Sequence, residues 1–173
     1  MLAFDEGRFG RHTWCRRRWC PRGKRPPWVV EQVFEWIWTY VVVDPLTGRC
    51  WSLLLPAVDG EVLQVFLDYL GGIFAGKRVG IVLDNAPSHR SQQVQWPEGL
   101  EPLRLPSYSP ELNPAEQIFR RFRAALSNQL FADQDALEEA VIQQLERLWE
   151  DRPAVQRLTA YPWWRDALPE ILS

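Results

Sequence analysis

The chain is poor in cysteine and has no long hydrophobic run, and each shortage excludes a class of protein. Its three cysteines, Cys15, Cys20 and Cys50, are odd in number and lack C-x-x-C spacing. That pattern indicates neither a disulfide framework nor a zinc site, and it fits a reducing cytoplasm. The longest apolar stretch, around Trp36 to Val43, is far shorter than the roughly 20 residues that span a bilayer. The first residues lack the basic and apolar regions of a signal peptide, so we expect a cytoplasmic protein.

Net charge is also nearly absent, but the charges are unevenly distributed. A formal charge of -2 argues against binding nucleic acid through overall charge. From Gly7 to Val30, however, there is no acidic residue, and eight of the twenty lysines and arginines lie there. These eight are Arg8, Arg11, Arg16, Arg17, Arg18, Arg22, Lys24 and Arg25. The stretch is either a DNA-binding surface suited to phosphates or a solvated basic loop.

Length and composition predict one soluble domain over residues 1–173, in which residues 131–173 form a C-terminal helical extension. Apolar and β-branched runs predict strands at Leu2–Asp5, Val33–Val43, Cys50–Leu55, Val79–Leu83 and Leu100–Leu105, the second and third forming an antiparallel hairpin. Helical periodicity predicts helices at Gly60–Ile73, Pro114–Leu130 and from Asp135 onward. The tail from Asp151 is weakly patterned. This order of elements predicts a mixed α/β domain.

In the first of these helices, the apolar residues that share one face predict which side is buried. They are Val62, Phe66, Tyr69, Leu70 and Ile73.

Three acidic residues occupy distinctive positions relative to these elements. Asp5 ends the first apolar run, Asp84 directly follows the apolar strand Val79–Leu83, and Glu116 lies in the first turn of a predicted helix. An acid at the carboxyl end of a central strand lies where open α/β sheets bind ligands. Carboxylates so placed are suited to holding a pair of divalent cations for phosphoryl transfer.

Each acid also has an ordinary structural explanation. Asp5 can be a strand-ending acid at a turn, and Asp84 can begin an Asx-type turn. Glu116 can be the third residue of a capping box that Asn113 and Pro114 begin. On spacing alone, capping is the favoured explanation of Glu116.

Residues beside the acids are candidates for supporting them or for contacting a phosphate. Glu6 adjoins Asp5, but strand alternation points the two side chains to opposite faces of the sheet. Asn85 and His89 follow Asp84 in the segment Asp84–His89. A turn histidine without a catalytic role is an equally good interpretation of His89.

Taken together, these motifs resemble the catalytic domain of DDE transposases, in the bacterial insertion-sequence branch of the mariner superfamily. Phe4–Glu6 resembles the first acid motif of that branch, and Trp19–Gly23 resembles its Trp-x-Pro-x-Gly loop. Leu83–His89 resembles the second acid motif with its trailing histidine, and Leu105–Glu116 resembles the long third motif. The resemblance spans roughly residues 2–130.

The resemblance implies a ribonuclease-H-like fold, in which a mixed five-stranded sheet is flanked by helices. It implies two Mg²⁺ or Mn²⁺ ions held by Asp5, Asp84 and Glu116, and cleavage and strand transfer of double-stranded DNA at the ends of a mobile element. Transposases of this kind usually act as homodimers.

Family members carry helix-turn-helix domains before the first acid, whereas here Met1 stands four residues before Asp5. We therefore expect the second half of a split reading frame whose first half supplies that module, a truncated remnant, or a trimmed chain. The alternatives to a transposase are a non-catalytic DNA-binding or assembly module and another ribonuclease-H-like nuclease.

Overall fold

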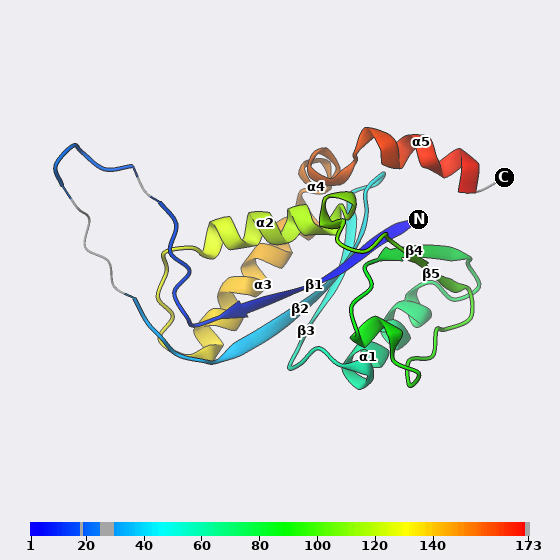
Figure 1. Cartoon of the computed structure of the whole chain (residues 1–173), viewed down its shortest axis with the longest axis horizontal. Helices are drawn as coiled ribbons and strands as arrows, with labels where there is room; N and C mark the ends of the chain where they lie inside the picture. The colour runs from blue at the N-terminus through cyan, green and yellow to red at the C-terminus, as the bar shows by residue number, and fades with distance from the viewer. Residues whose placement is uncertain (18, 25–29, 172–173) are drawn as a thin grey trace.

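A single mixed sheet of five strands organises the molecule (Figure 1). The computed structural model describes residues 1–17, 19–24 and 30–171. The strands are β1 (Leu2–Gly10), β2 (Trp36–Asp44), β3 (Arg49–Leu55), β4 (Val79–Leu83) and β5 (Leu100–Arg104). They lie in the order β3-β2-β1-β4-β5. Strand β1 runs antiparallel to β2 and parallel to β4, so the predicted hairpin and the predicted mixed five-stranded sheet are confirmed.

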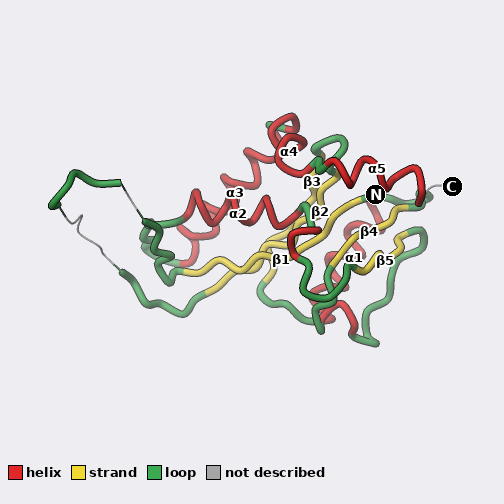
Figure 2. The backbone as a smooth tube through the Cα atoms, turned by 45° about the horizontal axis from the view of Figure 1, so that its top comes forward, coloured by secondary structure: helices red, strands yellow, loops and turns green. Residues whose placement is uncertain are grey.

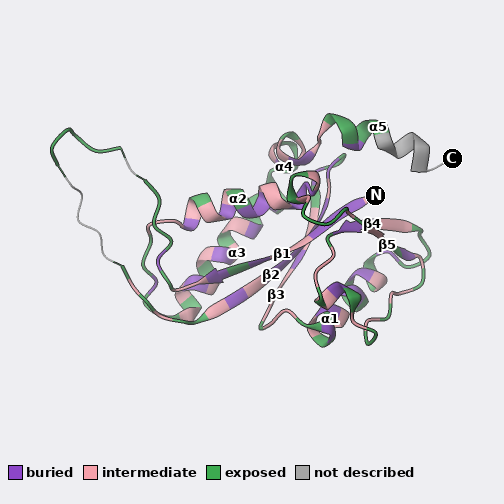
Figure 3. Cartoon of the chain, in the orientation of Figure 1, coloured by how far each residue is buried: buried purple, intermediate pink, exposed green. Residues whose placement is uncertain are grey.

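Helices cover both faces of this sheet, which gives the molecule two apolar cores (Figures 1 and 3). Helix α1 (Gly60–Ile73) packs on one face against even-numbered residues of β1 and β2, among them Phe4 and Tyr40. Helices α2 (Ala115–Leu126) and α3 (Gln134–Glu150) cover the other face, where Phe9 of β1 meets α2. Because side chains of β1 alternate between the two faces, Asp5 lies on the face covered by α2 and Glu6 on the face covered by α1.

The buried face of α1 is not the one that the sequence pattern indicated. Asp59 caps the helix as expected, because its Oδ1 accepts a hydrogen bond of 2.8 Å from the Val62 amide. The fully buried apolar side chains are Leu63, Phe66, Leu67 and Leu70. Tyr69 and Ile73 are instead 38% and 37% exposed. Two apolar stripes overlap on this helix and share Phe66 and Leu70, so periodicity alone could not separate them.

The C-terminal segments pack on the α2 side of the sheet. Helix α2 ends at Leu126, earlier than predicted, because Ser127 is extended (φ -67°, ψ 147°) and Asn128 after it is left-handed with φ 58°. The weakly patterned tail forms α4 (Arg152–Thr159) and α5 (Pro162–Ile171). Trp164 is fully buried in the same core as α2. No helix within the described ranges has both the length and the apolar character needed to cross a membrane.

Strands β1 and β2 extend well beyond β4 and lead into a segment that projects from the body of the molecule (Figures 1 and 2). Its described residues are 11–17, 19–24 and 30–35. At its base, the Arg11 guanidinium bonds to Glu31 at 3.0 Å and to Glu35 at 2.8 Å. Arg11 also donates to the backbone carbonyls of Phe131 and Ala132, which fixes the base of the projection to the segment before α3.

The close approach of β1 to α2 depends on Gly7, and this gives a first testable prediction. A Cβ on Gly7 would lie 2.1 Å from Cδ1 of the buried Phe119 ring. We expect Gly7→Ala to destabilise the protein by about 2 kcal/mol, because an overfilled core must shift. Chemical denaturation measures this. Gly72→Ala is the control, since a Cβ there meets nothing within 4 Å and alanine favours the helix. Equal stability of the Gly7 variant and the wild type would contradict the packing described.

Candidate active site

The acids Asp5, Asp84 and Glu116 line one pocket of about 460 Å³. Asp5 lies in the middle of β1, Asp84 follows the last residue of β4, and Glu116 lies in the first turn of α2. The β1–β4 pairing explains the meeting of the first two. Ala3 pairs with Val82, so two residues further along the parallel strands the same register brings Asp5 beside Asp84. The acids therefore line the same pocket although they are up to 111 positions apart in the sequence (116 - 5 = 111).

Asn113 fastens the start of α2 to β1 and so positions Glu116. Its Nδ2 donates to the Phe4 carbonyl at 2.9 Å, and its Oδ1 accepts from the Ala115 amide at 3.1 Å. Asn113 is 2% exposed, and both the nitrogen and the oxygen of its side chain are hydrogen-bonded. Phe4, which precedes Asp5, and Ala115, which precedes Glu116, are thus both bonded to the Asn113 side chain.

The capping-box explanation of Glu116 is not supported by these contacts. The reciprocal half of a capping box requires the Glu116 side chain to accept from the Asn113 amide. That amide instead donates to the Pro110 carbonyl at 3.0 Å. The Glu116 carboxylate lies 3.7 Å from the Arg123 guanidinium, and Glu116 lines the same pocket as Asp5.

The electrostatics of the pocket are those of crowded negative charges. Burial raises the pKa of Asp5 well above its usual value, and the neighbouring charges of Glu116, Glu6 and Asp84 raise it further. A hydrogen bond of 2.9 Å from the Glu6 amide to the Asp5 carboxylate acts in the opposite direction. Such a cluster of like charges is relieved by a bound cation.

The carboxylates are not converged into a ready coordination shell. Over the described residues, no group of three or more His, Cys, Asp or Glu side chains is arranged so as to hold a metal ion. Asp84 and Glu116 each have another partner. Asp84 accepts from the Ala86 amide at 2.9 Å, and Glu116 is turned toward Arg123. The donor set nevertheless fits hard divalent cations, which prefer carboxylate oxygens.

His89 lies between the carboxylates of Glu6 and Asp84. Its Nε2 lies 2.7 Å from the Glu6 carboxylate, and its Nδ1 lies 2.8 Å from the Asp84 carboxylate. The side chains of His89 and Glu6 are only 1% and 7% exposed. Burial opposes the charged ring, but the hydrogen bonds to Asp84 and Glu6 outweigh it and raise the pKa of His89 to about 10. The same bond from His89 lowers the pKa of Asp84. His89 is therefore a buried cation that orients Asp84.

Two further contacts hold the segment that follows Asp84. The Asn85 side chain donates to the Leu105 carbonyl at 2.6 Å, and the Arg104 guanidinium donates to the His89 carbonyl at 2.8 Å. Asn85 also lines the pocket of the three acids, whereas Glu6 lies on the opposite face of β1 from Asp5, as alternation predicts.

The basic residues of β1 and of the projecting segment fall into different environments. Arg11 is committed to its two ion pairs and to backbone carbonyls, so it is unsuited to binding phosphates. The Arg8 guanidinium lies over the Trp36 ring, 4.3 Å from its centroid, and 5.7 Å from that of Trp38. Exposed side chains are found at Arg16, Arg17, Arg22 and Lys24. Arg18 and Arg25 lie outside the described residues.

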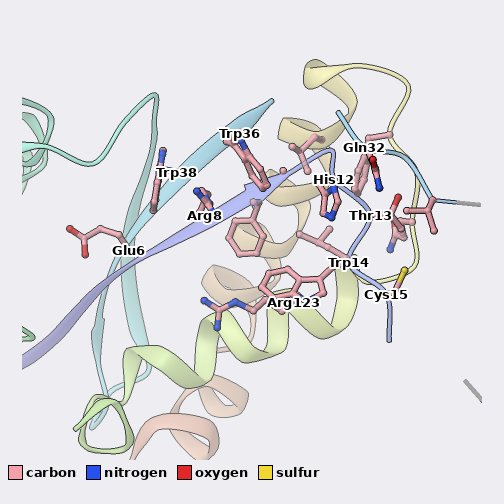
Figure 4. Close-up of a pocket in the computed structure, with 17 residues that line it drawn as sticks. Glu6, Arg8, His12, Thr13, Trp14, Cys15, Gln32, Trp36, Trp38 and Arg123 are labelled. Carbon is pink, nitrogen blue, oxygen red and sulfur yellow. The ribbon is translucent and has the colours of Figure 1, made fainter. Parts of the chain in front are cut away.

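A second pocket, of about 730 Å³, lies around the part of β1 that extends beyond β4 (Figure 4). Glu6, Arg8, Trp36 and Trp38 line one side of it, and Trp14 and Arg123 lie together on the side of α2.

Sequence reasoning overlooked three arginines near the acids. Arg90 lines the acid pocket, and Arg120 and Arg123 lie on α2 with Glu116. The spacing of 116, 120 and 123 along one helix face was the available signal.

A mixed five-stranded sheet flanked by helices, with acids on β1, after β4 and on α2, has the ribonuclease-H-like fold. Residues 1–138 match a family described as the DDE superfamily endonucleases. The chain belongs to this family, and the resemblance to DDE transposases is confirmed at that level.

Similar proteins were found both in sequence and in fold. An uncharacterised protein of Sinorhizobium fredii, y4pE/y4sA, is 33% identical over 102 residues, which are 58% of this chain and 76% of that protein. Among solved structures, the Mos1 strand transfer complex has a TM-score of 0.66 at 20% identity and covers 90% of this chain and 51% of its own. The mariner Mos1 paired end complex with Mg has a TM-score of 0.61 at 18% identity and covers 98% of this chain and 54% of its own. This chain therefore spans about half the length of those solved chains.

Proposed function

We propose that this chain is the catalytic domain of a transposase, which cleaves and joins DNA strands at the ends of a mobile element. The observation that carries the proposal is the meeting of Asp5, Asp84 and Glu116 in one pocket, from three elements far apart in the sequence. Membership of an endonuclease family and the fold shared with Mos1 complexes support the same chemistry.

Asp5, Asp84 and Glu116 would hold two Mg²⁺ or Mn²⁺ ions. When bound, such a pair activates a nucleophile and stabilises the leaving oxygen of an in-line displacement. The solved Mos1 paired end complexes with Mg and with Mn support this choice of metals. The burial and repulsion that raise the pKa of Asp5 favour a cation at this position.

The protein's own groups supply orientation and charge. The His89 imidazolium, held by Glu6, fixes the direction of the Asp84 carboxylate. Asn113 holds the first turn of α2 against β1 and so sets the distance between Glu116 and Asp5. Arg90 lines the same pocket as the three acids and is suited to a phosphate oxygen of the strand being cut.

The partners follow from this chemistry. Double-stranded DNA would be both the element end and the target, and the exposed arginines of the projecting segment would contact its backbone. Because transposases of the kind that this chain resembles usually act as dimers, we propose a homodimer. A separately encoded helix-turn-helix half would recognise the ends.

The free cysteines Cys15, Cys20 and Cys50 suit a reducing cytoplasm.

Metal-dependent nicking of supercoiled plasmid DNA tests this proposal. We expect nicking with Mg²⁺ or Mn²⁺ and none with EDTA, and DNA cut in preference to an RNA–DNA hybrid. Preferential cleavage of the RNA strand would favour another ribonuclease-H-like nuclease. Absence of nicking together with DNA binding would favour a binding or assembly module, and either result contradicts the transposase proposal.

A further inference from the structure

A row of arginines follows the exposed side of α2 away from the acid pocket. We name as the arginine strip the residues Arg120 and Arg123 of α2 together with Arg16 of the projecting segment. All three line a hollow of about 480 Å³, which Glu116 also lines. Because Glu116 lines both this hollow and the acid pocket, the strip begins where the proposed catalytic site ends.

Helix geometry explains why the strip is continuous with Glu116. Positions 116, 120, 123 and 127 are separated by four, three and four residues, so they lie along one side of a helix. From Glu116 to Ser127 the helix rises roughly 16 Å. One strand of a duplex carries a phosphate about every 3.4 Å, so the strip is long enough for several consecutive phosphates.

The tertiary contacts hold two arginines of the strip in place. Arg123 lies beside the half-exposed Trp14, with its guanidinium carbon 5.6 Å from the ring centroid (Figure 4). The Trp14 carbonyl accepts from the Asn128 amide at 2.9 Å, and the Arg16 amide donates to Oδ1 of Asn128 at 3.0 Å. The end of α2 thus anchors Trp14 and Arg16 alongside the helix.

Within the described residues, the strip forms one ion pair, between Arg123 and Glu116. Arg120 and Arg16 are exposed. Arg123 meets Glu116 only at 3.7 Å, and its buried Nε has no hydrogen-bond partner in the described part of the chain. The acids beside the strip are Glu116, which is directed to metal binding in the proposed function, and the exposed Glu111.

Building on the proposed function, we infer that the arginine strip binds the phosphate backbone of the DNA strand that enters the acid pocket. Guanidinium groups suit this role because they bind phosphate oxygens through two parallel hydrogen bonds. The strip contributes no base contacts, so its binding is independent of sequence. The strand would follow α2 from Ser127 toward Glu116, with Trp14 and Arg16 flanking it.

The dependence of DNA affinity on salt tests this inference. Fluorescence anisotropy with a labelled mixed-sequence duplex, at several salt concentrations and without divalent cations, compares the wild type with Arg120→Gln/Arg123→Gln. We expect at least about tenfold weaker binding. Each lost phosphate contact lowers the slope of log K against log salt by about 0.9, so the slope should fall by about two.

Two further variants separate this inference from general charge and from folding. Arg121→Gln removes a charge that lies about 100° around the same helix from Arg120 and about 160° from Arg123, and it should leave the slope unchanged. Arg120→Lys/Arg123→Lys keeps both charges and should retain most of the slope. The inference would be contradicted by an unchanged slope in the Gln double variant or by an equal fall in the Arg121 variant. The absence of salt-dependent binding by the wild type would also contradict it. Nicking by the wild type is measured in parallel, and its absence contradicts the proposed function without altering the binding comparison.

Discussion

Replacing any one of the three pocket acids with its amide is expected to abolish metal-dependent nicking. Asp5→Asn, Asp84→Asn and Glu116→Gln keep the shape of each side chain but remove a negative oxygen ligand. Metal ions contribute several kcal/mol of transition-state stabilisation in such sites. Since 1.36 kcal/mol is a factor of ten in rate, each variant should lose about a thousandfold or more. Initial rates of plasmid nicking with Mg²⁺ measure the loss.

The expected loss must come from the pocket and not from unfolding. Asp5 repels Glu116 and Asp84 in the folded state, so neutralising Asp5 relieves repulsion and should not destabilise the fold. Thermal melting checks this for all three. Glu139→Gln, at an exposed position on α3, is a matched control and should nick at the wild-type rate. A pocket variant that nicks within about twofold of the wild type would remove that acid from the mechanism.

Loss of the His89 charge is expected to cost both stability and activity. His89→Gln leaves the nearly buried Glu6 carboxylate without its ionic partner, and breaking a buried pair in this way costs about 3 kcal/mol or more. It also frees Asp84 to rotate. Removing a partner that orients a metal ligand typically lowers activity about ten- to a hundredfold. His12→Gln is the control, because His12 is the exposed second histidine of the chain.

The pH dependence of stability separates this ion pair from ordinary packing. The pKa of His89 is raised from 6.5 to about 10 in the folded protein, so the folded state binds the proton more tightly than the unfolded state. The resulting stabilisation is complete below pH 6.5 and disappears as the pH rises toward 10. In metal-free denaturation experiments, the advantage of the wild type over His89→Gln should therefore shrink across this range. A constant difference from pH 6 to 10 would contradict a charged His89.

Local patterns in the sequence predicted most of the elements, but not where they end. Strand β1 was expected to stop at Asp5 and instead continues to Gly10, because its second half pairs with β2. Strand length is thus set by a partner that local sequence does not reveal. The exposure of Tyr69 and Ile73 on α1 has a similar cause, since the sheet selects one of two overlapping apolar stripes.

At the candidate site too, local sequence patterns indicated which residues take part, whereas contacts between distant residues could not be predicted. Strand ends and the resemblance to DDE transposases indicated the three acids, and β-strand alternation placed Glu6 away from Asp5. The contact of Asn113 with the Phe4 carbonyl joins residues 109 apart in sequence, so no local pattern could reveal it. For the same reason, Glu116 looked like a capping residue until the partner of the Asn113 amide was known.

Binding of Mn²⁺, followed by electron paramagnetic resonance, tests most directly whether the three acids act on the same ions. The wild type should bind two ions per chain, and each of Asp5→Asn, Asp84→Asn and Glu116→Gln should weaken that binding, whereas Glu139→Gln should not. The readout requires neither DNA nor turnover. Wild-type Mn²⁺ affinity in all three pocket variants would contradict a shared metal centre and the function proposed from it.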